Sequence, residues 1–153
     1  MRIRAPKFRF FYAPVFVLLL LLTPQCTDKY EDNVPYVPVS LNINLDIRNE
    51  LKIPGNSIYI KEYGYGGIIV YCEIFDFMTP ANSIYHAYDA TCTNEVSTEC
   101  IVKIEDNSVF ASCPCCQNRY SLLDGRLQKG TAKWPLKQYV VRVVNNTLRI
   151  TNL

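Results

Sequence analysis

The residues best suited to chemistry in this chain of 153 residues are its seven cysteines. One lies near the N-terminus, one lies in an apolar stretch, and five fall within residues 92–116. In chain order they are Cys26, Cys72, Cys92, Cys100, Cys113, Cys115 and Cys116. Cysteine sulfur forms disulfides and binds metals, and the number of cysteines alone does not choose between these roles.

The spacing within the cysteine-rich stretch indicates a metal site. Cys113 and Cys116 form a Cys-x-x-Cys pair, which is a common half-site for zinc. Cys92 and Cys100 lie eight residues apart in a second predicted loop. We predict that these four cysteines bind a [2Fe–2S] cluster or a tetrahedral zinc ion. Because a spacing of eight is wide for a half-site, two loops held together by disulfides, with no metal, remain the alternative.

The chain offers little for catalysis by its own side chains. His86 is the only histidine and no nucleophile motif surrounds it, so we expect it to pack or to form a surface hydrogen bond. Thioredoxin-like chemistry needs a Cys-x-x-Cys motif at the start of a helix, whereas residues 117–123 have a strand pattern. Cys72 is expected to be a small buried residue. We therefore predict a module that catalyses nothing by itself rather than an enzyme.

The first 25 residues have the pattern of a secretory signal peptide. Basic residues precede an apolar stretch from Ala13 to Leu22, and no acidic residue occurs before Asp28. The apolar stretch is shorter than the roughly 20 residues that span a bilayer. Cys26 follows at the position where a lipoprotein signal peptidase would leave a lipidated cysteine, although the two residues before it are atypical. We predict lipidation of Cys26.

We predict a signal peptide over residues 1–25, a polar tether over residues 26–38 and one domain over residues 39–153. Four of the 16 Lys and Arg and none of the 14 Asp and Glu lie in the signal peptide, so no basic stripe for nucleic acid remains. Membrane attachment would come from the lipid and not from charge. The prediction is an exported, membrane-anchored lipoprotein of the bacterial cell envelope, with an unidentified redox or envelope partner, in a compartment where disulfides persist.

Strand patterns dominate after the tether. Residues 37–47 carry apolar side chains at every second position from Val39 to Ile47. Further strands are predicted at residues 57–61, 68–75, 84–88, 101–105, 109–112, 119–123, 138–144 and 147–151. The last two flank Asn145-Asn146, a pair that favours a type I′ hairpin. Short strands with frequent turns indicate an all-β antiparallel sandwich or barrel, with a small cysteine-containing subdomain inserted at about residues 88–134.

The order of motifs from residue 90 to residue 139 resembles the Rieske iron–sulfur family. The family pattern is Cys-x-His, a gap, Cys-x-x-His, an aromatic residue, a glycine turn, a Gly-Pro-Ala element, a Pro-Leu pair and a tyrosine that opens the last hairpin. The matching residues are Cys92-Thr93-Asn94, Cys113-Pro114-Cys115-Cys116, Tyr120, Gly125, Gly130-Thr131-Ala132, Pro135-Leu136 and Tyr139. The resemblance covers about a third of the chain closely. It implies a Rieske-like antiparallel sandwich that transfers electrons through a cluster-binding subdomain.

Two ligand positions depart from the family pattern. A Rieske centre uses two cysteines and two histidines, and the histidine positions are occupied here by Asn94 and Cys116. A cluster with two histidine ligands therefore cannot be built from this sequence. The resemblance also implies another role for Cys100 and Cys115, which match the positions of a disulfide that joins the two cluster loops in some members.

Overall fold

The computed structural model describes residues 33–106 and 109–153, so the predicted signal peptide and Cys26 lie outside the described residues. The described part consists of strands, turns and two short 3₁₀ helices. The elements are β1 (Ser40–Asn44), η2 (Asn49–Lys52), β2 (Ser57–Ile60), β3 (Ile68–Ile74), η3 (Pro80–Asn82), β4 (Ile84–Asp89), β5 (Lys103–Ile104), β6 (Phe110–Ser112), β7 (Arg119–Ser121), β8 (Leu127–Lys129), β9 (Gln138–Val144) and β10 (Thr147–Thr151). The predicted all-β fold class is confirmed.

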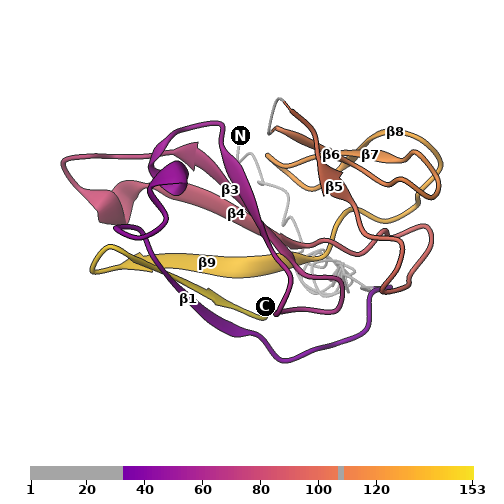
Figure 1. Ribbon diagram of the computed structural model, residues 1–153, viewed down its shortest axis with the longest axis horizontal. Coiled ribbons are helices and arrows are strands. Elements are labelled where there is room, and N and C mark those ends of the chain that lie inside the picture. Colours follow the sequence, from indigo (N-terminus) through magenta and orange to yellow (C-terminus); the bar gives the residue numbers. More distant parts are fainter. Residues whose placement is uncertain (1–32, 107–108) are drawn as a thin grey trace, which may run out of the picture. The chain divides into compact units, whose positions relative to one another are not determined.

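The larger sheet has six antiparallel strands in the order β1-β10-β9-β4-β3-β2. Its two halves are joined through β4 and β9, which share only the pairs Ala87↔Tyr139 and Tyr88↔Gln138. Beyond these pairs the two strands diverge, as Figure 1 shows. The half that contains β1 can therefore fold over the half that contains β3.

The core between these halves is built from alternating side chains of both. Its buried members are Val39, Leu41, Ile43, Leu45, Leu51, Ile68, Val70, Cys72, Phe75, Tyr85, Ala87, Tyr139, Leu148 and Ile150. Period-two alternation along each strand places these residues on one face of the sheet. Cys72 is fully buried here, which confirms its expected role as a small core residue.

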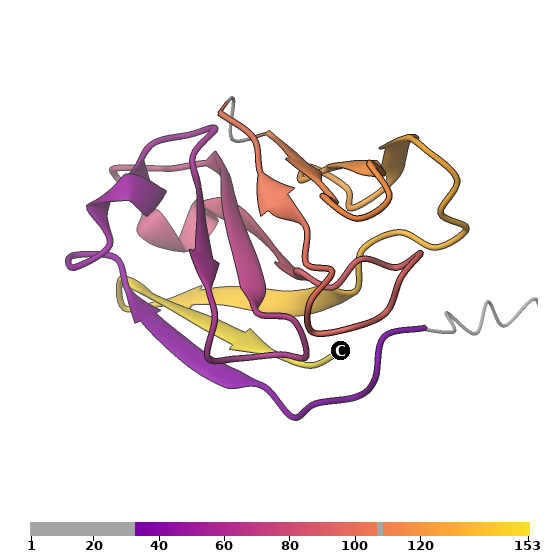
Figure 2. The ribbon, with the colours of Figure 1, turned by 45° about the vertical axis from the view of Figure 1, so that its right-hand side comes forward.

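The smaller sheet has four antiparallel strands in the order β5-β6-β7-β8, all of which lie between β4 and β9 in the sequence. Figure 2 shows this sheet, in orange, beside the strands of the larger one. A second core joins it to the outer face of β3 and β4. The buried members of this core are Ile69, Tyr71, Tyr88, Ala90, Cys92, Val102, Ala111, Cys113, Tyr120, Leu122 and Leu136.

Strand β3 is buried on both faces because it belongs to both cores. Ile68 and Val70 point into the first core, whereas Ile69 and Tyr71 point into the second. This explains why the sequence from residue 68 to residue 72 is apolar without alternation.

The first predicted strand is shorter than expected. The alternation predicts a strand that extends to Ile47, but β1 ends at Asn44 and Ile47 is 76% exposed. The backbone turns there because Asn44 accepts two hydrogen bonds. The N–H of Asp46 donates to Oδ1 of Asn44 at 2.7 Å, and the N–H of Ile47 donates to the carbonyl oxygen of Asn44 at 3.2 Å. An asparagine that bonds to its own following backbone favours such a turn over continued strand.

Candidate metal centre

Two loops at one end of the small sheet position the cysteines. Loop 1 (residues 91–101) is closed at its neck by the bridge between Thr91 and Ile101. Inside that neck the N–H of Cys92 donates to the carbonyl oxygen of Cys100 at 3.0 Å. The neck fixes Cys92 at the end of the chain segment that continues β4, where its side chain is fully buried.

Loop 2 (residues 113–118) is a tight turn between β6 and β7. The N–H of Gln117 donates to the carbonyl oxygen of Cys113 at 2.9 Å, and the N–H of Cys113 donates to the carbonyl oxygen of Asn118 at 2.8 Å. Gln117 adopts the left-handed conformation, with φ of 58°. This turn brings the first and last cysteines of the Cys-x-x-Cys motif to the same side of the loop.

The two loops bring three thiols together. The sulfur atoms of Cys92, Cys113 and Cys116 all lie within 4.8 Å of one another. Sγ of Cys92 is 3.3 Å from Sγ of Cys116. Three sulfurs at the corners of a zinc tetrahedron would lie roughly 3.8 Å apart, as follows from a Zn–S bond of about 2.3 Å. The thiol group is therefore compact enough for its members to bind one metal ion.

Backbone N–H groups are directed at these sulfurs. Burial raises the pKa of the Cys92 thiol, but hydrogen bonds from Cys113, from the backbone of Asn94 and Glu95, and from Cys116 outweigh it and leave the pKa below its usual value. Each such bond stabilises a thiolate. The same features that favour an anionic sulfur also favour a metal–thiolate bond.

The other two thiols favour the protonated form in the metal-free protein. Burial raises the pKa of the Cys113 thiol to about 12. Burial also raises the pKa of Cys116. Both S–H groups can then donate hydrogen bonds to the Cys92 sulfur. Metal binding at all three would release the remaining protons.

Tyr120 and Thr93 form a polar contact beside the thiols. The hydroxyl of Thr93 donates to the carbonyl oxygen of Trp134 at 2.7 Å and lies 3.0 Å from the hydroxyl of Tyr120. The single hydroxyl hydrogen of Thr93 is used in the bond to Trp134, so Thr93 cannot also donate to Tyr120. The hydroxyl of Tyr120 therefore donates either to the Thr93 oxygen or to Sγ of Cys92, which lies 3.9 Å away. Burial raises the pKa of Tyr120 to about 12, so it stays a donor.

Cys100 and Cys115 form a disulfide with Cα atoms 5.8 Å apart, which joins loop 1 to loop 2. This is the pairing that the resemblance implies. Of the four predicted metal ligands, the structure thus brings together Cys92, Cys113 and Cys116. A carboxylate oxygen of Glu95 lies near the disulfide sulfurs, but bonded sulfurs are not thiolate ligands.

Asp89, the last residue of β4, hydrogen-bonds to the first residue of loop 1. The sequence does not predict this role. The buried carboxylate of Asp89 accepts hydrogen bonds from the N–H of Tyr65 at 2.7 Å, of Gly66 at 3.0 Å and of Thr91 at 2.9 Å. The hydroxyl of Tyr139 donates to it at 2.8 Å. The segment of residues 64–67, which contains three glycines, thereby folds onto the end of β4.

His86 lies apart from the thiols, as expected. Its Nε2 is 2.6 Å from a carboxylate oxygen of Glu73, and its ring stacks between those of Tyr71 and Tyr88. The prediction that His86 packs or forms a hydrogen bond agrees with these contacts.

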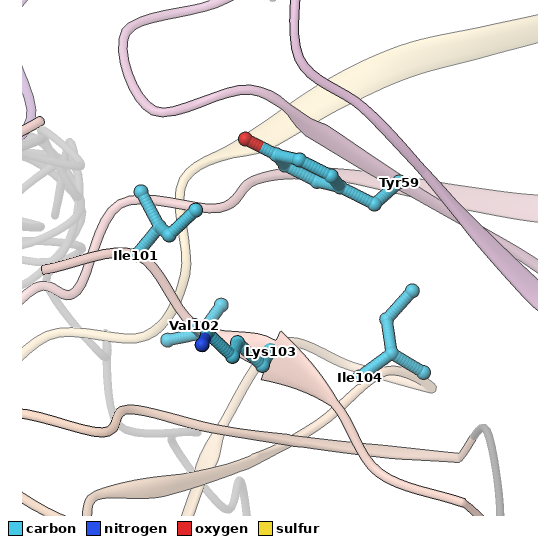
Figure 3. A pocket seen from close by; sticks show the side chains of 5 residues that line it. All are labelled: Tyr59, Ile101, Val102, Lys103 and Ile104. Atoms are coloured by element: carbon cyan, nitrogen blue, oxygen red, sulfur yellow. The ribbon is translucent and has the colours of Figure 1, made fainter. Parts of the chain in front are cut away.

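An apolar groove of about 300 Å³ lies between the edge strands of the two sheets. Figure 3 shows Tyr59 of β2 on one side and the segment from Ile101 to Ile104 on the other. Lys103 is the only charged residue in its lining, so the groove offers no second metal site.

Within residues 33–106 and 109–153, no helix combines the length and the apolar character needed to cross a membrane.

No family model matches the chain, and no curated protein matches it. Among solved structures, the chain is similar to the plasma membrane Rieske protein PetC3 from Synechocystis PCC 6803, with 20% identity and a TM-score of 0.49. That match covers 73% of this chain and 97% of the other. The ferredoxin of carbazole 1,9a-dioxygenase from Nocardioides aromaticivorans IC177 is 15% identical with a TM-score of 0.48, over 77% of this chain and 100% of the other.

The protein NirD from E. coli is 13% identical with a TM-score of 0.44, over 76% of this chain and 98% of the other. The strand order and the two cysteine loops of this chain itself define its fold.

Proposed function

We propose that this Rieske-like domain holds a metal centre between Cys92, Cys113 and Cys116 and serves as an electron-transfer module. The observation that carries the proposal is the meeting of three sulfurs from two loops within 4.8 Å. Hydrogen bonds from the backbone to these sulfurs support it, because they stabilise the thiolate form that a metal requires.

The donor set does not fit the centre of the resembling family. Asn94 and Cys116 stand at the positions of the two histidine ligands, and His86 bonds to Glu73 instead. A [2Fe–2S] cluster with four cysteine ligands needs one more thiolate than the group supplies. Cys100, predicted as that ligand, could join only if its disulfide with Cys115 were opened.

Three sulfurs and one open position fit a single tetrahedral ion instead. Tetrahedral sulfur ligands suit iron and zinc, and of these two metals iron supplies one-electron chemistry. The protein would hold the ion by three thiolates, while burial of Cys92 and Cys113 limits the access of water. Zinc in the same position would make the site structural.

Metal analysis of the processed full-length chain, purified from its host without oxygen, tests this proposal. We expect near-stoichiometric iron, absorption in the visible range, and loss of both in Cys116→Ser. Acid-labile sulfide together with four unpaired thiolates would instead support the four-cysteine cluster. Zinc alone would contradict electron transfer while keeping the metal site.

A disulfide-only domain that binds a partner is the second candidate. It is favoured by the 3.3 Å separation of the Cys92 and Cys116 sulfurs, which is close enough for a small movement to bond them. Export would place the domain where thiols oxidise. Absence of metal together with only Cys72 and Cys113 as free thiols in the mature domain would favour this candidate.

The predicted lipid on Cys26 would place the module on a membrane of the cell envelope. Support comes from the signal-like residues 1–25 and the polar tether that follows. In this location the domain would exchange electrons with a redox partner of the envelope, while the lipid supplies the attachment.

A further inference from the structure

The first described residues of the chain are fixed against the cysteine loops. The side-chain amide of Asn33 donates to the carbonyl oxygen of Thr93, the residue after Cys92. Nζ of Lys137 donates to the carbonyl oxygen of Val34 at 3.2 Å. Val34 itself is buried. We call loops 1 and 2 together with residues 33–36 the cysteine end of the domain. The residues before Asn33 therefore join the domain at its cysteine end.

Two amphipathic aromatic side chains are exposed at this end. Tyr36 is 70% exposed, and its ring centroid lies 5.7 Å from Nζ of Lys137. Trp134 is 39% exposed, and its carbonyl oxygen accepts the hydrogen bond from Thr93. Tryptophan and tyrosine are the side chains enriched in the headgroup layer of a bilayer, where one part of the ring is apolar and the other is hydrated.

The tether is short compared with the domain. Of the predicted tether, residues 26–38, only the seven residues from Cys26 to Asp32 precede Asn33, and these seven reach at most about 25 Å when fully extended. Strand β9 runs for seven residues, or roughly 23 Å, from the cysteine end to the Asn145-Asn146 turn. A lipid on Cys26 would therefore bring the cysteine end to the bilayer, whereas the opposite end would reach it only with a fully stretched tether.

We propose that the cysteine end docks on the bilayer surface, with Trp134 and Tyr36 in the headgroup layer, so that the three thiols lie close to the membrane. This orientation rests on the proposed lipid anchor and not on which metal is bound. The exposed tip of the β3–β4 hairpin, which carries Phe77 and Met78, then faces away from the membrane.

Trp134 is the only tryptophan of the chain and reports on its own position. The processed lipoprotein is reconstituted into phosphatidylcholine vesicles with or without bromine atoms on the acyl chains, and Trp134 emission is recorded. We expect a blue shift on reconstitution and loss of emission in the brominated vesicles. Trp134→Phe combined with Phe77→Trp moves the fluorophore to the opposite end and should abolish the loss.

Equal loss of emission at both positions, or no loss at either, in protein that sediments with the vesicles would overturn the orientation while leaving the anchor intact. Protein that does not sediment with the vesicles would overturn the anchor and the orientation together. Neither result depends on metal content, so failure of the proposed metal centre is detected separately.

Discussion

Gly130 holds a conformation that other residues reach only with strain. Its φ is +121°, and a Cβ atom built there would lie 1.8 Å from Oδ1 of Asn118. Asn118 fixes loop 2 through its bond with Cys113. We expect Gly130→Ala to lower the free energy of unfolding by about 2 kcal/mol or more, since strain and a steric clash add. Urea denaturation followed by circular dichroism measures this change.

Gly55→Ala is the matched control for Gly130→Ala. Gly55 also has a positive φ, of +89°, but nothing lies within 4 Å of a Cβ built there. We expect this variant to cost only the conformational strain, on the order of 1 kcal/mol. Equal losses in the two variants would show that the contact with Asn118 does not matter for stability.

Cys113 should matter both for stability and for metal. It is 1% exposed and its sulfur belongs to the thiol group. We expect Cys113→Ser to abolish metal binding and to lower the free energy of unfolding by more than 1 kcal/mol, since a buried ligand is lost. Elemental analysis and urea denaturation give the two readouts.

Cys72→Ser separates burial from ligation. Cys72 is equally buried but lies in the first core, away from the three thiols. This variant should lose stability and keep its metal. If Cys113→Ser kept full metal content and full stability, its roles as ligand and as core residue would both be wrong.

Three strands of the small sheet are linked by one carboxylate at its edge. Glu105, just after β5, accepts two hydrogen bonds of 2.8 Å from Arg119 of β7 and one from Ser112 of β6. The bonds from Arg119, followed by that from Ser112, lower the pKa of Glu105 from its usual 4.5 to about 2. The guanidinium carbon of Arg119 lies over the ring of Phe110 in β6, 3.6 Å from the ring centroid.

This pKa shift predicts how the stability depends on pH. A carboxylate with a lowered pKa contributes stability that is full above the unfolded pKa near 4.5 and is lost as the pH falls toward 2. Glu105→Gln should therefore be less stable than the wild type at pH 7, and the difference should shrink between pH 4.5 and pH 2. Thermal unfolding across this range measures it, and a difference independent of pH would contradict the assignment.

The disulfide joins the two loops across 15 residues of sequence. Removing it by Cys100→Ser with Cys115→Ser should lower the free energy of unfolding by about 3 kcal/mol, the value that loop entropy gives for this length. Wild-type protein in reductant should behave like the double variant. Metal content should persist if three thiolates suffice, whereas loss of metal in the variant would indicate that Cys100 is a ligand.

Most strands could be predicted because their patterns are local. The last hairpin is the clearest case: β9 and β10 have the predicted bounds, and Asn145 and Asn146 have φ of 47° and 58°. The two-residue strand β5 and the unpredicted β8 carry too few residues for a period to show. Tertiary pairing with neighbouring strands decides such short elements.

The candidate site was less accessible from sequence than the fold. Cys115 and Cys116 are adjacent, yet one enters the disulfide and the other the thiol group. The turn at Gln117 sets these directions, and a non-glycine residue at positive φ leaves little trace in sequence. Asp89 and Thr93 were missed because their partners are mostly backbone groups brought in from distant segments.

At the scale of the whole molecule, the proposed attachment to a membrane depends on one predicted modification. Cys26→Ala should release the protein from the membrane fraction into the soluble envelope fraction, because no acyl chain would be added. Fractionation followed by immunoblotting measures the distribution. An unchanged membrane fraction would refute the lipid anchor, and Cys72→Ala provides a control in which a cysteine is lost elsewhere.

Because β3 contributes side chains to both cores, neither core can come apart while the other keeps its full set of contacts. The domain should therefore unfold in a single cooperative transition. A substitution that destabilises the cysteine loops should then also lower the stability of the distant strand β1. A chain exported unfolded would then assemble its thiol group and pack its first core in the same event, because both require β3 to be ordered.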